Sequence, residues 1–222
     1  MNNSNNVAAY DAPQTLTILE SIATSNFGTS DLMNAAKYLR HPVSAVLEVG
    51  PGSGRCLDYF LQLDSAPEVI VGIEVSSVLV NHLTTKYRED KRVSIVLGSV
   101  LDDTVLARSN NKFDAVLVMW STLMEFSPAE QQRIFLRCAQ WLTSGGLLLV
   151  DVSNPGNRGH VTLVHSQPIS YDVPMGGQLH VYLPSPEEMA AYAQAANLKS
   201  IAVEDWTPPN NVVRRLYVFE KP

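Results

Sequence analysis

The chain of 222 residues is 45% hydrophobic and 17% charged, and its formal net charge at pH 7 is -6. This length and composition suit one domain with its own hydrophobic core, which excludes an intrinsically disordered protein. The acidic balance, without a cluster of Lys and Arg, argues against a nucleic-acid partner, because such proteins usually present a basic face.

Localisation signals are lacking in the sequence. Residues 1–6 have no basic segment followed by an apolar one, so we expect no secretion signal. No apolar run approaches the length that spans a bilayer, and we expect no membrane partner. Cys56 and Cys138 lie in helical patterns, where a buried, reduced thiol is the usual state. These features predict a cytoplasmic protein.

The first part of the chain, residues 1–42, is expected to hold a tail and helices. Residues up to about Tyr10 read as a disordered tail. Apolar residues at helical spacing then predict two short helices, over about 16–22 and 32–39. Two interpretations stay open for these helices: packing on a sheet edge, or forming a lid over a ligand.

Residues 43–222 are expected to form a single α/β domain. Apolar runs at 44–49, 69–73, 93–97, 113–119 and 147–152 alternate with helical patterns. This rhythm predicts a doubly wound, mostly parallel seven-stranded sheet. Residues 199–206 and 212–219 close it as an antiparallel C-terminal hairpin. Two capping boxes, Ser127 to Glu130 and Ser185 to Glu188, mark helix starts.

A small inserted β ribbon is predicted over residues 159–184, where the strand–helix rhythm breaks. Residues 160–166 and 178–183 alternate like two strands around the turn-rich segment 174–177. The ribbon falls at the carboxyl edge of the sheet, where open α/β folds bind ligands. We expect His165, Tyr171 and His180 to orient a ligand there, or the ribbon to be an ordinary hairpin that covers the sheet edge.

The most informative stretch runs from Val46 to Gly54, where an apolar strand breaks into Gly50, Gly52 and Gly54. A strand that leads into a glycine turn and a helix is the usual nucleotide-binding corner of such a sheet. A dinucleotide fingerprint would need its third glycine at position 55, which is Arg55 here. With Glu48 at the strand end, the stretch resembles motif I of the class I S-adenosylmethionine-dependent methyltransferases.

That resemblance covers the chain from about Ser44 onward and implies a Rossmann-like enzyme that converts S-adenosylmethionine to S-adenosylhomocysteine. It places the glycine loop under the methionine part of the cofactor, Glu48 toward its ammonium group and Glu74 on the ribose hydroxyls. Ser99 and Val100 follow the third strand, where the family contacts adenine; Asp102 is an alternative. The implied cofactor-binding residues are Glu48, Gly50, Pro51, Gly52, Gly54, Glu74, Val75, Ser99, Val100 and Met119.

The residues at the end of the fourth predicted strand exclude several classes of substrate. Met119-Trp120-Ser121-Thr122 lacks the D/N-P-P-Y motif of DNA and glutamine methyltransferases and the metal-binding aspartate of the catechol type. We therefore expect metal-independent methyl transfer to oxygen or nitrogen of a small molecule. Trp120 either packs in the core or lines the pocket.

The proton acceptor is the least defined part of the site. His165 and Glu125 are the candidate catalytic residues, beside His160, His180, Tyr171 and Tyr182 of the ribbon. A histidine suits proton transfer near neutrality, although a single histidine is more often structural. Two other functions remain: a protein or non-methylating enzyme that retains the cofactor, and a nicotinamide oxidoreductase, which Arg55 disfavours.

Overall fold

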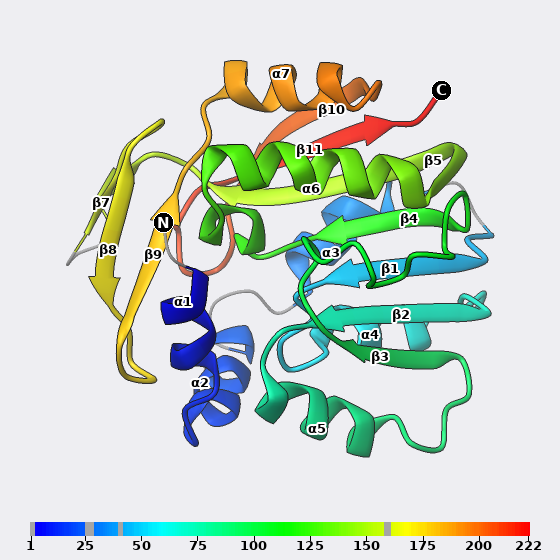
Figure 1. Ribbon diagram of the computed structural model, residues 1–222, viewed down its shortest axis with the longest axis horizontal. Coiled ribbons are helices and arrows are strands. Elements are labelled where there is room, and N and C mark those ends of the chain that lie inside the picture. Colours follow the sequence, from blue (N-terminus) through cyan, green and yellow to red (C-terminus); the bar gives the residue numbers. More distant parts are fainter. Residues whose placement is uncertain (1–2, 25–28, 40–41, 158–160) are drawn as a thin grey trace.

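The computed structural model describes residues 3–24, 29–39, 42–157 and 161–222, and a seven-stranded sheet forms its centre (Figure 1). The strand order is β10-β11-β5-β4-β1-β2-β3. Pairs among β1 to β5 are parallel, whereas β11 runs antiparallel to β5 and β10. The predicted fold class is confirmed. The strands are β1 (Ala45–Val49), β2 (Val69–Glu74), β3 (Val93–Leu97), β4 (Phe113–Val118), β5 (Leu142–Ser153), β10 (Lys199–Trp206) and β11 (Arg214–Glu220).

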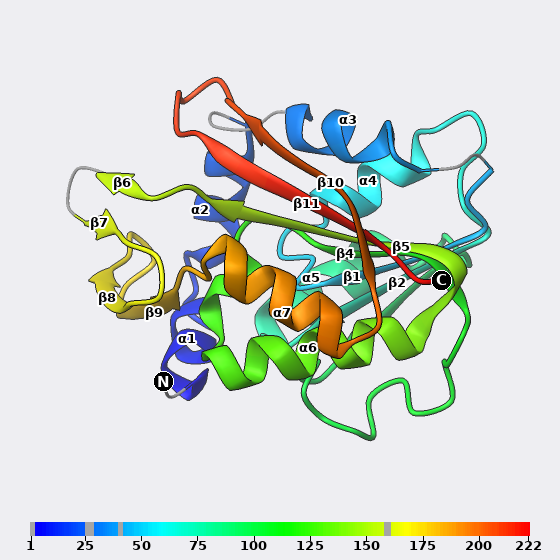
Figure 2. The same cartoon turned by 90° about the horizontal axis from the view of Figure 1, so that it is seen from above.

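Helices cover both faces of the sheet, with α3 and α4 on one face and α6 and α7 on the other (Figure 2). Alternate strand residues supply the two cores: Leu47 and Val49 belong to one cluster, and Val46 belongs to the other. The near-continuous apolar strands therefore reflect burial on both sides. The helices of the domain are α3 (Ser30–Ala36), α4 (Arg55–Leu61), α5 (Ser77–Lys86), α6 (Pro128–Trp141) and α7 (Pro186–Ala195).

The two predicted capping boxes are confirmed. The backbone N–H of Ser185 donates to Glu188 Oε2 at 2.7 Å, and the N–H of Glu188 donates to Ser185 Oγ at 3.2 Å. The N–H of Ser127 donates to Glu130 Oε2 at 2.8 Å. These contacts satisfy amide groups that the first helical turn leaves unpaired, and they fix the starts of α6 and α7.

The expected disordered tail is wrong for the described residues, because α1 (Asn3–Tyr10) and α2 (Thr15–Ile22) lie at the carboxyl ends of the central strands (Figure 1). Asn6 is 1% exposed. Its Nδ2 donates to His180 O at 2.9 Å, and the His180 N–H donates to its Oδ1 at 2.9 Å. The polar sequence of α1 carries no amphipathic signal; contacts with distant residues hold it in place.

The ribbon is present, but its first arm lies later than predicted. β8 (Pro168–Asp172) pairs antiparallel with β9 (Gln178–Tyr182), while β7 (Thr162–Leu163) pairs with β6 (Gly156–Asn157). In β8, Ile169 and Tyr171 are half-buried between exposed neighbours, which is the alternation of a one-sided strand. His160 lies outside the described residues. None of the described helices is long and apolar enough to cross a membrane.

Candidate active site

A cavity of about 360 Å³ lies at the carboxyl ends of the central strands. Its floor comes from the glycine loop and the ends of β1, β2 and β4, and its walls from α1, α2, the ribbon and the start of β11. This is the edge at which open α/β sheets bind ligands. Tyr10 and Leu19 line it together with the loop, so the N-terminal helices cover the site.

The three glycines of the loop have positive φ angles of 71° at Gly50, 57° at Gly52 and 86° at Gly54, a conformation that favours glycine. A Cβ on Gly50 would lie 2.9 Å from Thr122, and one on Gly54 would lie 2.5 Å from the Tyr87 hydroxyl. A Cβ on Gly52 would meet only Leu19, at 3.7 Å. Gly52 therefore turns bare backbone toward the cavity, whereas Gly54 shapes the turn from outside it.

Glu48 is a buried carboxyl group on the cavity wall. It is 3% exposed, and its Oε2 has no hydrogen-bond partner among the described residues. Burial raises its pKa to about 8, against the lowering effects of a hydrogen bond with Cys56 and the charge of Arg55. A buried polar atom without a partner is rare in folded proteins. This one suits the cationic part of a ligand.

Glu74 closes β2 and holds the glycine loop. Its Oε1 accepts from the N–H groups of Val75 at 2.8 Å and Ser76 at 3.0 Å, and its Oε2 accepts from Gly52 at 3.1 Å. Burial raises the pKa of Glu74, while these three bonds lower it. A carboxylate has about four acceptor positions. To accept hydrogen bonds from two ligand hydroxyls with both oxygens, Glu74 must therefore exchange the hydrogen bond from the Gly52 N–H for one from the ligand.

The other cofactor candidates divide between the cavity and its surroundings. Val75, Val100 and Met119 line the cavity. Ser99 does not; its Oγ accepts from the Leu101 N–H at 3.1 Å within a turn. The cavity residues among the predicted set are Glu48, Gly50, Pro51, Gly52, Glu74, Val75, Val100 and Met119.

Of the two candidate bases, the structure brings only Glu125 into the cavity. Glu125 ends the short helix η2 (Thr122–Glu125) after β4, and Tyr10 Oη donates to its Oε1 at 2.5 Å. Burial raises the pKa of Glu125 to about 7, and the Tyr10 hydrogen bond acts in the opposite direction. A carboxyl group with a pKa near neutrality is suited to accept a proton.

The ribbon histidines point elsewhere. His165 Nδ1 lies 2.9 Å from the carbonyl oxygen of Pro184, beside the start of α7 and outside the cavity lining. His180 Nδ1 lies 2.5 Å from Ser170 Oγ. Tyr182 Oη donates to Glu188. Among these ribbon candidates, Tyr171 lines the cavity.

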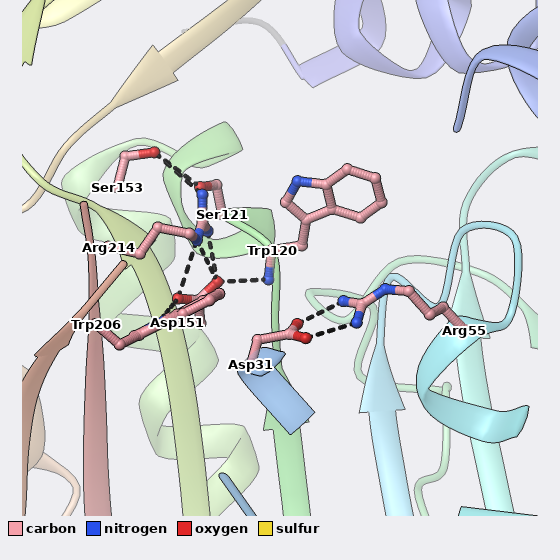
Figure 3. Close-up of polar contacts among 8 residues, drawn as sticks. All are labelled: Asp31, Arg55, Trp120, Ser121, Asp151, Ser153, Trp206 and Arg214. Atoms are coloured by element: carbon pink, nitrogen blue, oxygen red, sulfur yellow. Dashed lines mark hydrogen bonds and ion pairs between the residues drawn. The ribbon is translucent and has the colours of Figure 1, made fainter. Parts of the chain in front are cut away.

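A buried polar cluster beside β4 is a feature that the sequence reasoning missed (Figure 3). Arg214 Nη2 lies 2.5 Å from Asp151 Oδ2 and donates to Ser121 Oγ at 2.9 Å, while Nη1 donates to Ser153 Oγ at 3.3 Å. Arg214 is opposite Ser153 in the β11–β5 register, so strand pairing brings the cluster together. Polar residues at the ends of two predicted strands were the available signal.

A second ion pair approaches the cavity from the glycine-loop side. Arg55 Nη1 donates to Asp31 Oδ1 at 2.6 Å, and its guanidinium lies 5.6 Å from the centre of the Trp120 ring (Figure 3). Trp120 lines the cavity, as one of its two sequence interpretations expects. Arg55, which stands where a dinucleotide fingerprint would have its third glycine, thus anchors α3 to α4.

Comparison with known proteins points to the methyltransferases. Residues 46–146 match the family model of a methyltransferase domain. Over this stretch, which is just under half of its length, the chain is similar to the class I S-adenosylmethionine-dependent methyltransferases. The matched family uses S-adenosylmethionine as its cofactor, and the unpartnered Glu48 carboxyl and the open face of Gly52 fit that ligand. None of the curated proteins searched matches the chain.

Solved structures share the fold of this methyltransferase at low sequence identity. The 1,6-didemethyltoxoflavin-N1-methyltransferase of Burkholderia thailandensis has a TM-score of 0.67 and 17% identity, over 97% of this chain and 88% of that one. The [4+2]-cyclase SpnF has a TM-score of 0.72 and 18% identity, over 100% and 97%. The glycopeptide N-methyltransferase MtfA has a TM-score of 0.66 and 19% identity, over 88% and 95%.

Proposed function

We propose that this enzyme transfers the methyl group of S-adenosylmethionine to an oxygen or nitrogen atom of a small-molecule acceptor, without a metal ion. The observation that carries the proposal is the position of Glu125. Glu125, whose pKa is raised to about 7, lies in the same cavity as the predicted cofactor residues Glu48 and Glu74. Two of the structurally similar enzymes, from Burkholderia thailandensis and MtfA, are N-methyltransferases.

Contacts between two walls of the cavity favour a small acceptor. Asn6 fastens α1 to the ribbon through two hydrogen bonds with His180. The side-chain amide of Gln14 donates to the carbonyl oxygen of Met175 at the ribbon turn. These contacts lie across the site, between the N-terminal helices and the ribbon. A folded macromolecule would have to displace them to reach the cavity, whereas a small molecule fits beneath them.

The residues of the chain would divide the work as follows. The cofactor, when bound, supplies an activated methyl group. Glu48 would face its ammonium group and Glu74 its ribose, and Glu125 would accept the proton of the acceptor O–H or N–H. Positioning alone lowers the barrier of such a displacement by several kcal/mol. Proton removal by a placed side chain adds typically about 10²–10⁴-fold in rate.

Substitution of Glu125 tests the proposal. With a panel of amines and phenols as acceptors, S-adenosylhomocysteine formation is measured for the wild type and for Glu125→Gln. We expect turnover to fall by about 100-fold or more, with cofactor affinity unchanged. Glu187→Gln, at an exposed site on α7, is the matched control. His165→Gln decides between the two candidate bases: a loss of turnover there with full activity in Glu125→Gln would reverse the assignment.

Chelation tests the metal-independent part. No carboxylate occupies positions 119 to 121, and no group of three or more metal-ligating side chains is found among the described residues. We expect turnover to survive dialysis against EDTA. Loss of activity with recovery on adding magnesium would assign the enzyme to a metal-dependent subgroup.

A second candidate is a non-methylating enzyme that retains the cofactor. The whole-chain fold match to the [4+2]-cyclase SpnF supports it. Calorimetry with S-adenosylmethionine and turnover assays on the acceptor panel separate the two. Tight cofactor binding without transfer to any acceptor would favour the second candidate.

A further inference from the structure

The cavity wall farthest from Glu74 along the sheet carries a hydrogen-bonding corner made of Ser121, Ser153 and Arg214 (Figure 3). All three line the cavity, whereas Asp151, the partner of Arg214, is fully buried behind them. A ligand in the cavity can therefore contact the guanidinium and the two hydroxyls but not the carboxylate of Asp151.

Sheet order separates this corner from the cofactor residues. Glu48 and Glu74 belong to β1 and β2, while Ser121 follows β4, Ser153 ends β5 and Arg214 begins β11. In the sheet, β4, β5 and β11 follow one another on the side of β1 opposite to β2. The corner thus faces the part of the cavity left for the methyl acceptor.

The hydroxyl protons of Ser121 and Ser153 show how many hydrogen-bond donors are available to a ligand. Ser121 and Ser153 each accept an N–H from Arg214, and their Oγ atoms are 3.4 Å apart. Arginine has no acceptor atom, so each hydroxyl keeps its own proton to donate. One proton serves the contact between the serines, and the other has no acceptor among the described residues. At least one O–H is therefore available to a ligand.

The backbone holds the corner in a costly conformation. Trp120 and Ser121 have φ angles of 50° and 66°. Asp151 fixes both: its Oδ2 accepts from the Trp120 N–H at 3.1 Å, and its carbonyl oxygen accepts from the Ser121 N–H at 2.9 Å. Such strain persists where surrounding contacts over-determine the geometry, and it gathers at ligand sites.

The charges around the cavity select the ligand group. Four carboxyl groups line it, and each of its two arginines is paired with an aspartate. An anionic ligand group would face the carboxyl groups without an uncompensated cation. A neutral carbonyl oxygen avoids this repulsion and accepts from hydroxyls that Arg214 polarises. The lining acids are Glu48, Glu74, Glu125 and Asp172.

We propose that the hydroxyl pair of Ser121 and Ser153, oriented by Arg214, donates an O–H to a carbonyl oxygen of the methyl acceptor. The acceptor class is then a neutral small molecule with a carbonyl group and, within reach of Glu125, an N–H or O–H group. This assignment rests on the proposed function, because it takes this end of the cavity as the acceptor end.

The test uses the full chain saturated with S-adenosylhomocysteine and three probes of similar size: benzamide, benzoate and toluene. Dissociation constants are measured by ligand-observed NMR for the wild type, Ser121→Ala and Ser153→Ala. Ser166→Ala is the control, since that hydroxyl donates to Glu188 outside the cavity. Calorimetry gives the affinity of each variant for S-adenosylhomocysteine.

We expect the wild type to prefer benzamide over both other probes. Each cavity serine variant should weaken benzamide by about three- to tenfold, the range for one hydrogen bond, without changing toluene or cofactor binding. A wild type that binds S-adenosylhomocysteine without preferring benzamide would overturn the assignment. Stronger binding of benzoate would replace it with an anion site. Loss of cofactor affinity in both serine variants would assign the corner to the cofactor, and a wild type that binds no cofactor would overturn the proposed function itself.

Discussion

Tyr10 Oη donates a hydrogen bond to Glu125 Oε1 at 2.5 Å, joining residues 115 positions apart in the chain. The contact ties α1 to η2, the short helix after β4, and places a phenol against the proposed base. Because a donor stabilises the ionised carboxylate, the bond lowers the pKa of Glu125 against the effect of burial.

Tyr10→Phe should therefore raise the pKa of Glu125 above about 7. The acid limb of the kcat/KM profile should move to higher pH, because the base must be ionised to accept a proton. Full pH profiles of both proteins measure this shift. Tyr59→Phe, on α4 away from the cavity, is the control and should leave the limb in place. A limb that stays fixed in Tyr10→Phe would mean that another group titrates.

Glu74→Ala should weaken S-adenosylmethionine binding by about 1.5–3 kcal/mol, the range for hydrogen bonds to a charged group. The loop also loses its anchor, because Glu74 accepts from the Gly52 N–H. Glu74→Gln keeps one acceptor oxygen and should lose less. Calorimetry measures both affinities, and circular dichroism checks the fold. Unchanged affinity in a folded Glu74→Ala protein would remove Glu74 from the ribose site.

Cofactor binding should become tighter as the pH rises toward about 8, the pKa of Glu48 in the free protein. A cationic ammonium group favours the ionised carboxylate, so binding below that pH should release a proton. Calorimetry in buffers with different ionisation enthalpies counts the protons. Glu48→Gln should abolish the pH dependence together with much of the affinity. Proton uptake in the wild type would contradict the assignment.

The same group affects the stability of the free protein. The folded-state pKa of Glu48 is raised to about 8 from its ordinary value of 4.5. Its contribution to stability is therefore complete below pH 4.5 and is lost as the pH rises through about 8. Without cofactor, Glu48→Gln should melt at a higher temperature than the wild type at pH 9, and the difference should shrink at pH 6. An equal difference at both pH values would show that ionisation of Glu48 plays no part.

Gly52→Val should abolish cofactor binding, because its side chain would point into the cavity with only Leu19 nearby. Valine is also strained at a φ of 57°. Gly177→Val separates the two effects, since Gly177 has a φ of 79° in the ribbon turn and does not line the cofactor cavity. We expect both variants to lose stability and only the Gly52 variant to lose calorimetric binding. Tight binding by Gly52→Val would place the cofactor elsewhere.

Local patterns account for what the sequence predicted correctly. The β3 bounds, the capping boxes and the glycine loop all depend on neighbouring residues, and the family motif located Glu48 and Glu74. The Arg214–Asp151 pair spans 63 positions, and the Asn6–His180 bonds span 174. Such contacts arise from strand register and from packing of separate elements, which periodicity does not encode.

The choice between His165 and Glu125 as the proposed base was also beyond what the sequence pattern predicts. Histidine is a common residue type for proton transfer near neutrality, yet His165 lies beside α7. Glu125 reaches the cavity because two residues with positive φ, Trp120 and Ser121, turn the chain between β4 and η2. The spacing of apolar and polar residues does not predict that turn.

The side-chain amide of Asn6 both donates to and accepts from the backbone of His180, as the backbone of a neighbouring strand would. These two bonds act as a latch that holds α1 against the ribbon. We expect this contact to open when substrates enter and products leave, because it joins two walls of the cavity. The rate of opening then sets an upper limit on kcat, whatever the speed of the chemical step. We therefore expect an affinity tag fused directly before α1 to slow turnover more than a C-terminal tag after β11.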